Sequence, residues 1–135
     1  MGISTFYGFG TKRSGVETLA AARTLKEGDS GKLFLLNATE GAQIVLPSPK
    51  RGLGFRFLTA GAFGTTAWTL TTSTNIIQGS LIVGGASVPL EDENTITFVA
   101  TSETLGDYVE LLSDGTNYYA NGIGAGEGAL TGTQE

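Results

Sequence analysis

The sequence predicts an all-β protein, folded as a small single-domain β-sandwich or β-barrel of about eight short strands. Apolar and polar residues alternate with a period of two through most of the chain between residues 32 and 121, which is the strand pattern. Glycine makes up 21 of the 135 residues, about twice its usual share of roughly 7%, and supplies tight turns. Hydrophobic residues are too frequent (40%) and charged residues too few (16%) for a disordered chain.

The predicted strands follow one another at short spacing, separated by turn residues. Pro47 and Pro49 end the second strand, because proline breaks a strand ladder, and Asp114-Gly115 predicts a hairpin turn before the last one. The first strand, KLFLLN, is continuously apolar, which is typical of a strand covered on both faces. We expect strands at residues 32–37, 43–46, 53–59, 66–72, 94–100, 107–112 and 116–121, with shorter ones near 76–77 and 81–83.

Both ends of the chain differ from this core of residues 19–121. Residues 1–18 form a predicted N-terminal arm, in which Phe6, Tyr7 and Phe9 stand among glycines and precede Lys12 and Arg13. Leaving three aromatic side chains in water costs roughly 1.5–3 kcal/mol each, so we expect them to pack on their own domain, a neighbouring subunit or a partner. Residues 15–23 are the one candidate helix, and residues 122–135 are a glycine-rich tail that is either loose or a docking strap.

The chain contains neither histidine nor cysteine, which excludes most familiar catalytic and zinc-binding arrangements. Carboxylate-pair hydrolysis and oxygen-ligated calcium remain possible in principle, but we expect no enzyme, no cofactor and no metal site. No apolar run approaches the ~20 residues of a membrane span, and no secretion signal is expected.

The charges are divided between the two parts of the chain. All eight Lys and Arg lie within residues 1–56, whereas residues 57–135 contain nine acids and no base. The chain is acidic as a whole, with a formal charge of −5, and offers no dense basic face for nucleic acid. Such asymmetry suits complementary contacts between protein subunits, although chance segregation on a solvated surface explains it equally well.

Three groups of residues within the core are candidate binding sites. The acidic run 91–93 lacks the spacing of a calcium loop and is expected to be a solvated turn. Trp68, Tyr118 and Tyr119 are candidates for a sugar-stacking platform, but aromatic residues on strands are more often core or interface. Any pair of carboxylates is formally a glycosidase candidate, yet nothing in the sequence sets their separation.

The order of five short motifs is more specific than any one of them. DSGK (29–32), LPSP (46–49), GLGFRF (52–57), GDYVEL (106–111) and SDGTNYY (113–119) succeed one another across residues 24–121. This succession resembles small virion structural proteins of tailed bacteriophages, in particular capsid decoration (cement) proteins. The familiar form has Trp where this chain has Tyr118.

The resemblance implies a function carried by surfaces. A homotrimer on the outer capsid surface of the virion would bridge neighbouring subunits of the major capsid protein. We expect the N-terminal arm, with Phe6, Tyr7, Phe9, Lys12 and Arg13, to make this contact. A phage tail-fibre or baseplate β-module, or a carbohydrate-binding module, are the alternatives.

Overall fold

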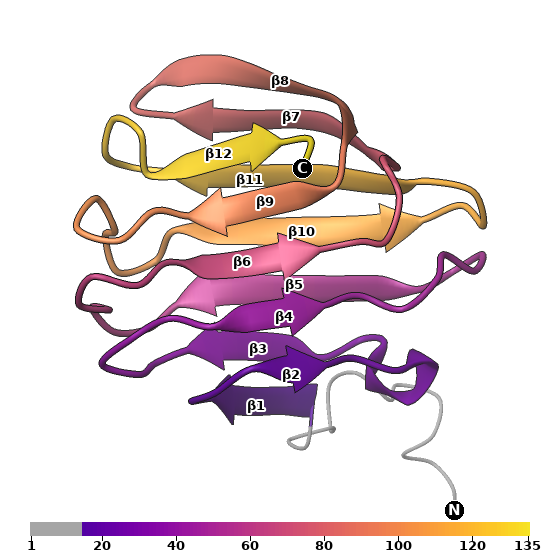
Figure 1. Ribbon diagram of the computed structural model, residues 1–135, viewed down its shortest axis with the longest axis horizontal. Helices are drawn as coiled ribbons and strands as arrows, with labels where there is room; N and C mark the ends of the chain where they lie inside the picture. The colour runs from indigo at the N-terminus through magenta and orange to yellow at the C-terminus, as the bar shows by residue number, and fades with distance from the viewer. Residues whose placement is uncertain (1–14) are drawn as a thin grey trace, which may run out of the picture.

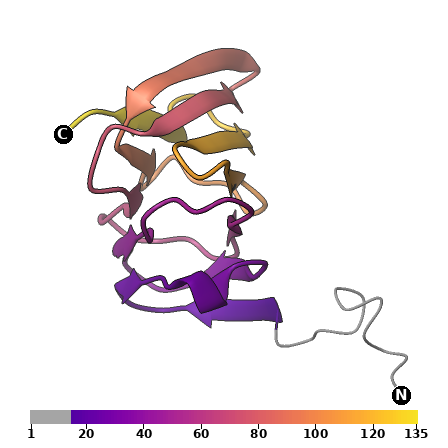
Figure 2. The ribbon, with the colours of Figure 1, turned by 90° about the vertical axis from the view of Figure 1, so that its right-hand side faces the viewer.

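The computed structural model describes residues 15–135 and confirms an all-β fold, built from two mixed sheets that lie face to face (Figures 1 and 2). It has twelve strands, so the prediction of about eight was wrong. The seven-stranded sheet contains, in spatial order, β1 (Val16–Leu19), β3 (Leu33–Leu36), β5 (Gly54–Thr59), β10 (Tyr108–Ser113), β11 (Tyr118–Gly124), β7 (Ile77–Val83) and β8 (Ala86–Glu93). The five-stranded sheet contains β12 (Leu130–Thr133), β9 (Thr95–Phe98), β6 (Trp68–Thr71), β4 (Gln43–Val45) and β2 (Arg23–Thr24).

The first half of the described chain winds like a solenoid. Strands β1 to β6 alternate between the two sheets, and the first four each pair in parallel with the strand two places later: β1 with β3, β2 with β4, β3 with β5 and β4 with β6. The second half is mostly antiparallel, since β10 pairs with β5 and β11, β9 with β6 and β12, and β7 with β8. The hairpin β7–β8 therefore forms one end of the seven-stranded sheet, opposite the end that contains the first coil of the solenoid, β1 and β2 with their connections (Figure 1).

The core fills the space between the two sheets, with the period of two that the sequence predicts. Inward side chains alternate with outward ones along β3, β5, β10 and β11. The rings of Phe34 and Phe57 stack at 5.5 Å between centroids, and Trp68 is completely buried. Burial of each such aromatic side chain contributes roughly 1.5–3 kcal/mol, so this layer is the main source of stability.

The candidate helix at residues 15–23 is instead the strand β1, followed by a tight connection to β2. Its helix-like spacing arises because Leu19 points into the core while Val16 points outward, which a strand satisfies equally well. A three-residue 3-10 turn, η3 (Glu27–Asp29), lies between β2 and β3. Strands β2 and β8 were also not predicted, because β2 has only two residues and β8 contains Pro89 among exposed polar positions.

The glycine-rich segment 122–135 is not simply a tail. β11 continues to Gly124, and β12 joins the five-stranded sheet with Leu130 only 1% exposed. A Cβ on Gly132 would lie 2.4 Å from Leu90 Cδ2, so glycine permits close packing of β12 against β8 here. The sequence suggested flexibility where the structure uses the missing side chain for close approach.

Turn chemistry was predicted more successfully. The Asp114 carboxylate accepts hydrogen bonds from the backbone N–H groups of Thr116 and Asn117, each at 2.8 Å, and Gly115 has a φ of 101°. The two short strands expected near 76–77 and 81–83 are one strand, β7, whose pairing with β8 is irregular between Ile77 and Gly79.

Candidate functional site

The residues predicted to contact a partner, Phe6, Tyr7, Phe9, Lys12 and Arg13, lie outside the described residues. Within residues 15–135, acidic side chains form no group of three or more arranged to hold a metal ion. The same part of the chain includes no long apolar helix of the kind that crosses a bilayer. The features with functional interest are therefore one ionic cluster and the two outer faces of the sheets.

The ionic cluster occupies the first coil, at the end of the core. Glu17 in β1 is the register partner of the buried Phe34, and Arg23 in β2 is the partner of the buried Ile44. Paired residues of neighbouring strands point to the same side of a sheet, so both charged side chains take positions that are apolar in the next coil. Terminal repeats of solenoids need such a polar outer layer, because nothing stacks on them.

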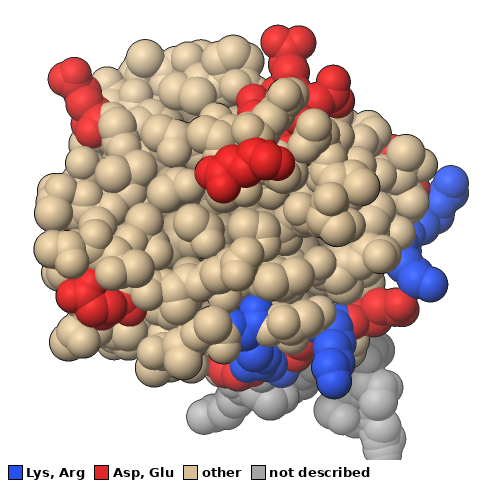
Figure 3. All heavy atoms as spheres, in the orientation of Figure 1, with Lys and Arg blue, Asp and Glu red and all other residues tan. Residues whose placement is uncertain are grey.

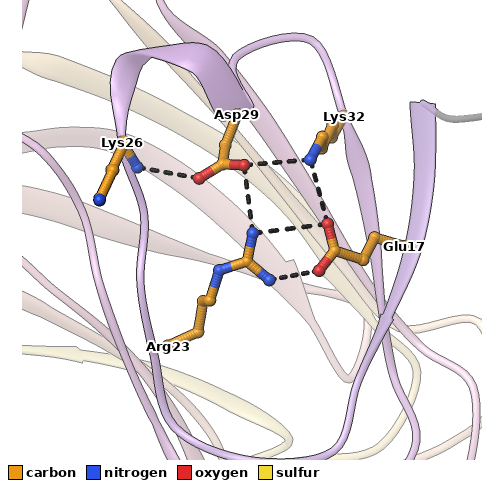
Figure 4. Close-up of polar contacts among 5 residues, drawn as sticks. All are labelled: Glu17, Arg23, Lys26, Asp29 and Lys32. Carbon is orange, nitrogen blue, oxygen red and sulfur yellow. Dashed lines mark hydrogen bonds and ion pairs between the residues drawn. The ribbon is translucent and has the colours of Figure 1, made fainter.

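Four charged side chains form this cluster, which we call the end cluster: Glu17, Arg23, Asp29 and Lys32 (Figure 4). The Arg23 guanidinium contacts Glu17 and lies 3.1 Å from Asp29 Oδ1. Lys32 Nζ lies 3.1 Å from Glu17 Oε1 and 3.1 Å from Asp29 Oδ1. The backbone N–H of Lys26 donates to Asp29 Oδ2 at 2.9 Å, so each carboxylate is bound by several donors.

These contacts fix the protonation states of the end cluster. Hydrogen bonds from Arg23 and then Lys32 lower the pKa of Glu17. Burial opposes ionisation of Asp29, but the Lys26 N–H and the Lys32 ammonium outweigh it and hold the pKa of Asp29 below its usual value. A carboxylate held ionised in this way is poorly suited to general acid–base catalysis, for which a pKa near the working pH is best. The end cluster is a structural cap on the core.

An apolar stripe crosses the outer face of the seven-stranded sheet. Its members are consecutive register partners on β3, β5, β10, β11 and β7 and point away from the core. Ile123 and Ile82 are 47% and 43% exposed, and the others are half-buried. We call this set the apolar row: Leu35, Leu58, Tyr108, Ile123 and Ile82.

A charged row runs beside the apolar row on the same face. Here Arg56 on β5 is the register partner of Glu110 on β10, and Leu33 on β3 precedes them. Glu110 accepts a hydrogen bond from Asn121 Nδ2 at 3.4 Å, whereas Arg56 is exposed and takes part in none of the ion pairs found within residues 15–135. A hollow of about 230 Å³ lies next to this pair, where the small Gly54 takes an outward position.

The outer face of the five-stranded sheet has a different character. Threonine side chains stand on it in two rows across β6, β9 and β12, in register with one another: Thr69, Thr97 and Thr131 in one row, and Thr71, Thr95 and Thr133 in the other. A shallow hollow of about 510 Å³ lies at one end of this face, between the Pro47–Pro49 segment and Asn94. This face is turned to the viewer in Figure 3 and is mostly uncharged.

The division of charge along the sequence becomes a division in space. In Figure 3 the Lys and Arg side chains gather at the lower side and the right, towards the β1–β5 end, and the upper part carries acidic groups alone. One end of the fold therefore carries both basic and acidic side chains. Within residues 15–135 the other end, near β8 and β12, carries acidic side chains without basic ones.

Trp68 and Tyr118 are both completely buried, so a sugar-stacking platform made of Trp68, Tyr118 and Tyr119 does not exist on the surface. The Tyr118 hydroxyl donates to the Pro47 carbonyl oxygen at 2.8 Å, which places this ring in the core as a structural residue. The acidic run 91–93 was wrongly expected to be a turn: it belongs to the strand β8, where Asp92 is bound by Gln78.

Sequence reasoning missed the apolar row, although a signal for it was present. The predicted strands at 32–37, 53–59 and 107–112 have apolar residues on both of their faces, which a half-solvated strand does not need. What the sequence lacks is the pairing of strands that sets these residues side by side.

Comparisons with known protein families, with curated protein sequences and with solved structures found no match to this chain.

Proposed function

We propose that this protein is a structural component of a phage virion, which decorates the capsid from outside and cements it by bridging neighbouring major capsid protein subunits. It acts as a homotrimer, through its surfaces and not by catalysis. The proposal starts from the order of motifs in the sequence. The structural observation that carries it is the apolar row, because a contiguous apolar stripe on an outer face marks a surface that protein covers in the working state.

The mechanism is mechanical. A decoration protein whose footprint spans two capsid subunits binds the assembled lattice better than free subunits, and so opposes their separation under internal pressure. A standard interface of ~1,600 Å² suffices for specific binding. Association into a trimer raises the effective concentration of the second and third contacts, so each copy binds more firmly than it would alone.

The arm supplies the contact with the capsid in this proposal. Its aromatic residues, Phe6, Tyr7 and Phe9, are anchors of the type that dominates interface energetics, and Lys12 and Arg13 add charge beside them. The described chain begins at residue 15, directly before β1 and the end cluster.

Particles assembled with the protein lacking residues 2–14 test this proposal. We expect capsid occupancy, measured by quantitative gel analysis of purified particles, to fall at least tenfold. The control is a Thr69→Ala variant on the outer face of the five-stranded sheet, which should bind normally. Full occupancy by the shortened protein would refute the role of the arm, and cryo-electron microscopy that places the protein on the tail would refute capsid decoration itself.

A further inference from the structure

We propose that the outer face of the seven-stranded sheet is the surface through which copies of this chain associate, with the apolar row of one copy packed against the same face of the next. This inference rests on the self-association in the proposed function, but not on binding to a capsid. It identifies the partner of that face as a second copy of the chain.

The first argument is the make-up of the apolar row. Five neighbouring strands each contribute an outward side chain, four of them aliphatic and one the aromatic ring of Tyr108 with its hydroxyl group. Ile123 and Ile82, near one end of the row, are almost half exposed within residues 15–135. Burying such side chains fully contributes on the order of 25 cal/mol per Å² of apolar surface removed from water, which favours association.

The second argument is area. Strands lie ~4.8 Å apart and rise ~3.3 Å per residue, so a sheet of seven strands and about six residues covers roughly 600 Å² in projection. A stable interface buries about 800 Å² of accessible surface on each partner, and accessible surface exceeds the projected area because side chains corrugate it. The face is therefore large enough for a specific contact between two copies.

The third argument is charge complementarity of the face with itself. Arg56 and Glu110 occupy adjacent positions beside the apolar row. The face therefore carries both signs of charge, and when copies meet through it Arg56 of one copy can pair with Glu110 of the next. A face with one sign of charge would instead repel its own copy.

The fourth argument is that the edges of the sheets are protected against association. β8, at one edge of the seven-stranded sheet, contains Pro89, which has no N–H to donate, and Asp92, whose φ of 54° breaks the strand geometry. At the opposite end, the end cluster places charge where another coil would stack. Proline, charge and distortion are the means by which sheet edges avoid pairing, and they direct association to the face.

Two lysine substitutions test the inference on the purified full-length protein. Ile123→Lys and Ile82→Lys each place a charge within the apolar row but at half-exposed positions, so the fold should tolerate them. We expect the wild-type protein to be oligomeric by light scattering coupled to size exclusion, and each variant to self-associate at least 100-fold more weakly, as for a lost interface anchor. Thr69→Lys on the other sheet is the matched control and should assemble like the wild type.

A charge exchange tests the pairing of Arg56 with Glu110. Arg56→Glu and Glu110→Arg should each weaken self-association, because both set like charges against one another across the interface. Mixing the two variants should restore self-association in part, because two of the three interfaces in a mixed trimer again set Arg against Glu. A wild-type protein that is monomeric, or an oligomer that survives both lysine substitutions, overturns the inference, and failure of the mixture to recover overturns the pairing of Arg56 with Glu110.

These outcomes are separate from those of the capsid experiment. A monomeric protein that still binds capsids overturns the inference and leaves capsid decoration standing. An oligomer that the lysine variants disrupt, but which binds no capsid, supports the inference and overturns capsid decoration.

Discussion

Substitution of Asp29 separates the contributions that its individual contacts in the end cluster make to the stability of the fold. Its carboxylate is 13% exposed and has three partners: the Lys26 N–H at 2.9 Å, Arg23 at 3.1 Å and Lys32 at 3.1 Å. The bond to the Lys26 N–H resembles an N-terminal cap, which contributes ~1 kcal/mol. Two partly exposed ion pairs add ~0.5–1 kcal/mol each. We therefore expect Asp29→Ala to lower the free energy of unfolding by about 2–3 kcal/mol.

Asp29→Asn divides this loss into its parts. The amide oxygen of Asn still accepts the Lys26 N–H, whereas both ion pairs are lost, so the expected cost falls to ~1–2 kcal/mol. Arg23 and Lys32 are not left without a partner in either variant, because Glu17 still binds both. Urea unfolding at pH 7, followed by tryptophan fluorescence, measures the differences, since Trp68 is the only tryptophan.

The control for this pair is Glu27→Ala. The Glu27 carboxylate lies 3.6 Å from Lys50, and both side chains are more than half exposed, so the cost should stay within ~0.5 kcal/mol. If Asp29→Ala is no more costly than Glu27→Ala, the end cluster does not stabilise the fold. If Asn and Ala at position 29 are equally costly, the bond to Lys26 contributes nothing.

The stabilisation of the fold by the end cluster also has a defined pH dependence. Because the pKa of Asp29 and that of Glu17 are lower in the folded protein, their stabilisation is present above the unfolded-state values and is lost as the pH falls through the folded ones. The gap between wild type and Asp29→Asn should therefore narrow as the pH is lowered from 7 to below ~4. A gap that is constant over this range would contradict the ionic explanation.

Two further substitutions probe the core and the irregular part of β7. Gly79→Ala should destabilise the fold by ~1–3 kcal/mol, because Gly79 has a φ of 125° and a Cβ would lie 2.2 Å from the Ala120 carbonyl oxygen. Ser80→Ala is the control. If the two variants have the same free energy of unfolding, the steric explanation for Gly79 is wrong. Tyr118→Phe should cost ~1–2 kcal/mol in urea unfolding, because the Pro47 carbonyl loses its hydrogen-bond donor. Burial, together with the charge of Glu27, raises the pKa of Tyr118 to about 12, so the wild type should lose stability as the pH rises above ~10, and Tyr118→Phe should lose less.

The sequence predicted the fold well where its signal is local. Strand alternation in β5 and β10, and the turn at Asp114-Gly115, depend on neighbouring residues and were found. The first coil was misread because β1 and β2 are short, and because the inward positions of this coil are Glu17 and Arg23. A charged residue at an inward position contradicts the strand pattern unless the position is known to lie at the end of the core.

The candidate sites were predicted unevenly, for a related reason. Single residues were assigned by type, and this worked for the buried aromatics, since Trp68 and Tyr118 were expected to be core more often than a sugar platform. The parallel pairing of β7 with β11 could not be foreseen, because their register depends on contacts between residues about 41 positions apart, as Ile82 and Ile123 show. The apolar row exists only once that register is set.

The strand β3 connects the sequence pattern to the proposed assembly. Its run KLFLLN predicts a strand covered on both faces, and Phe34 and Leu36 are indeed completely buried on the inner side. On the outer side, Leu33 and Leu35 lie on a face that no other element of residues 15–135 covers. A cover supplied by a further copy satisfies the pattern on both sides of the strand. The same reasoning extends to Leu58 on β5, so under the proposed assembly the outer apolar positions serve association between copies and not folding of the single chain.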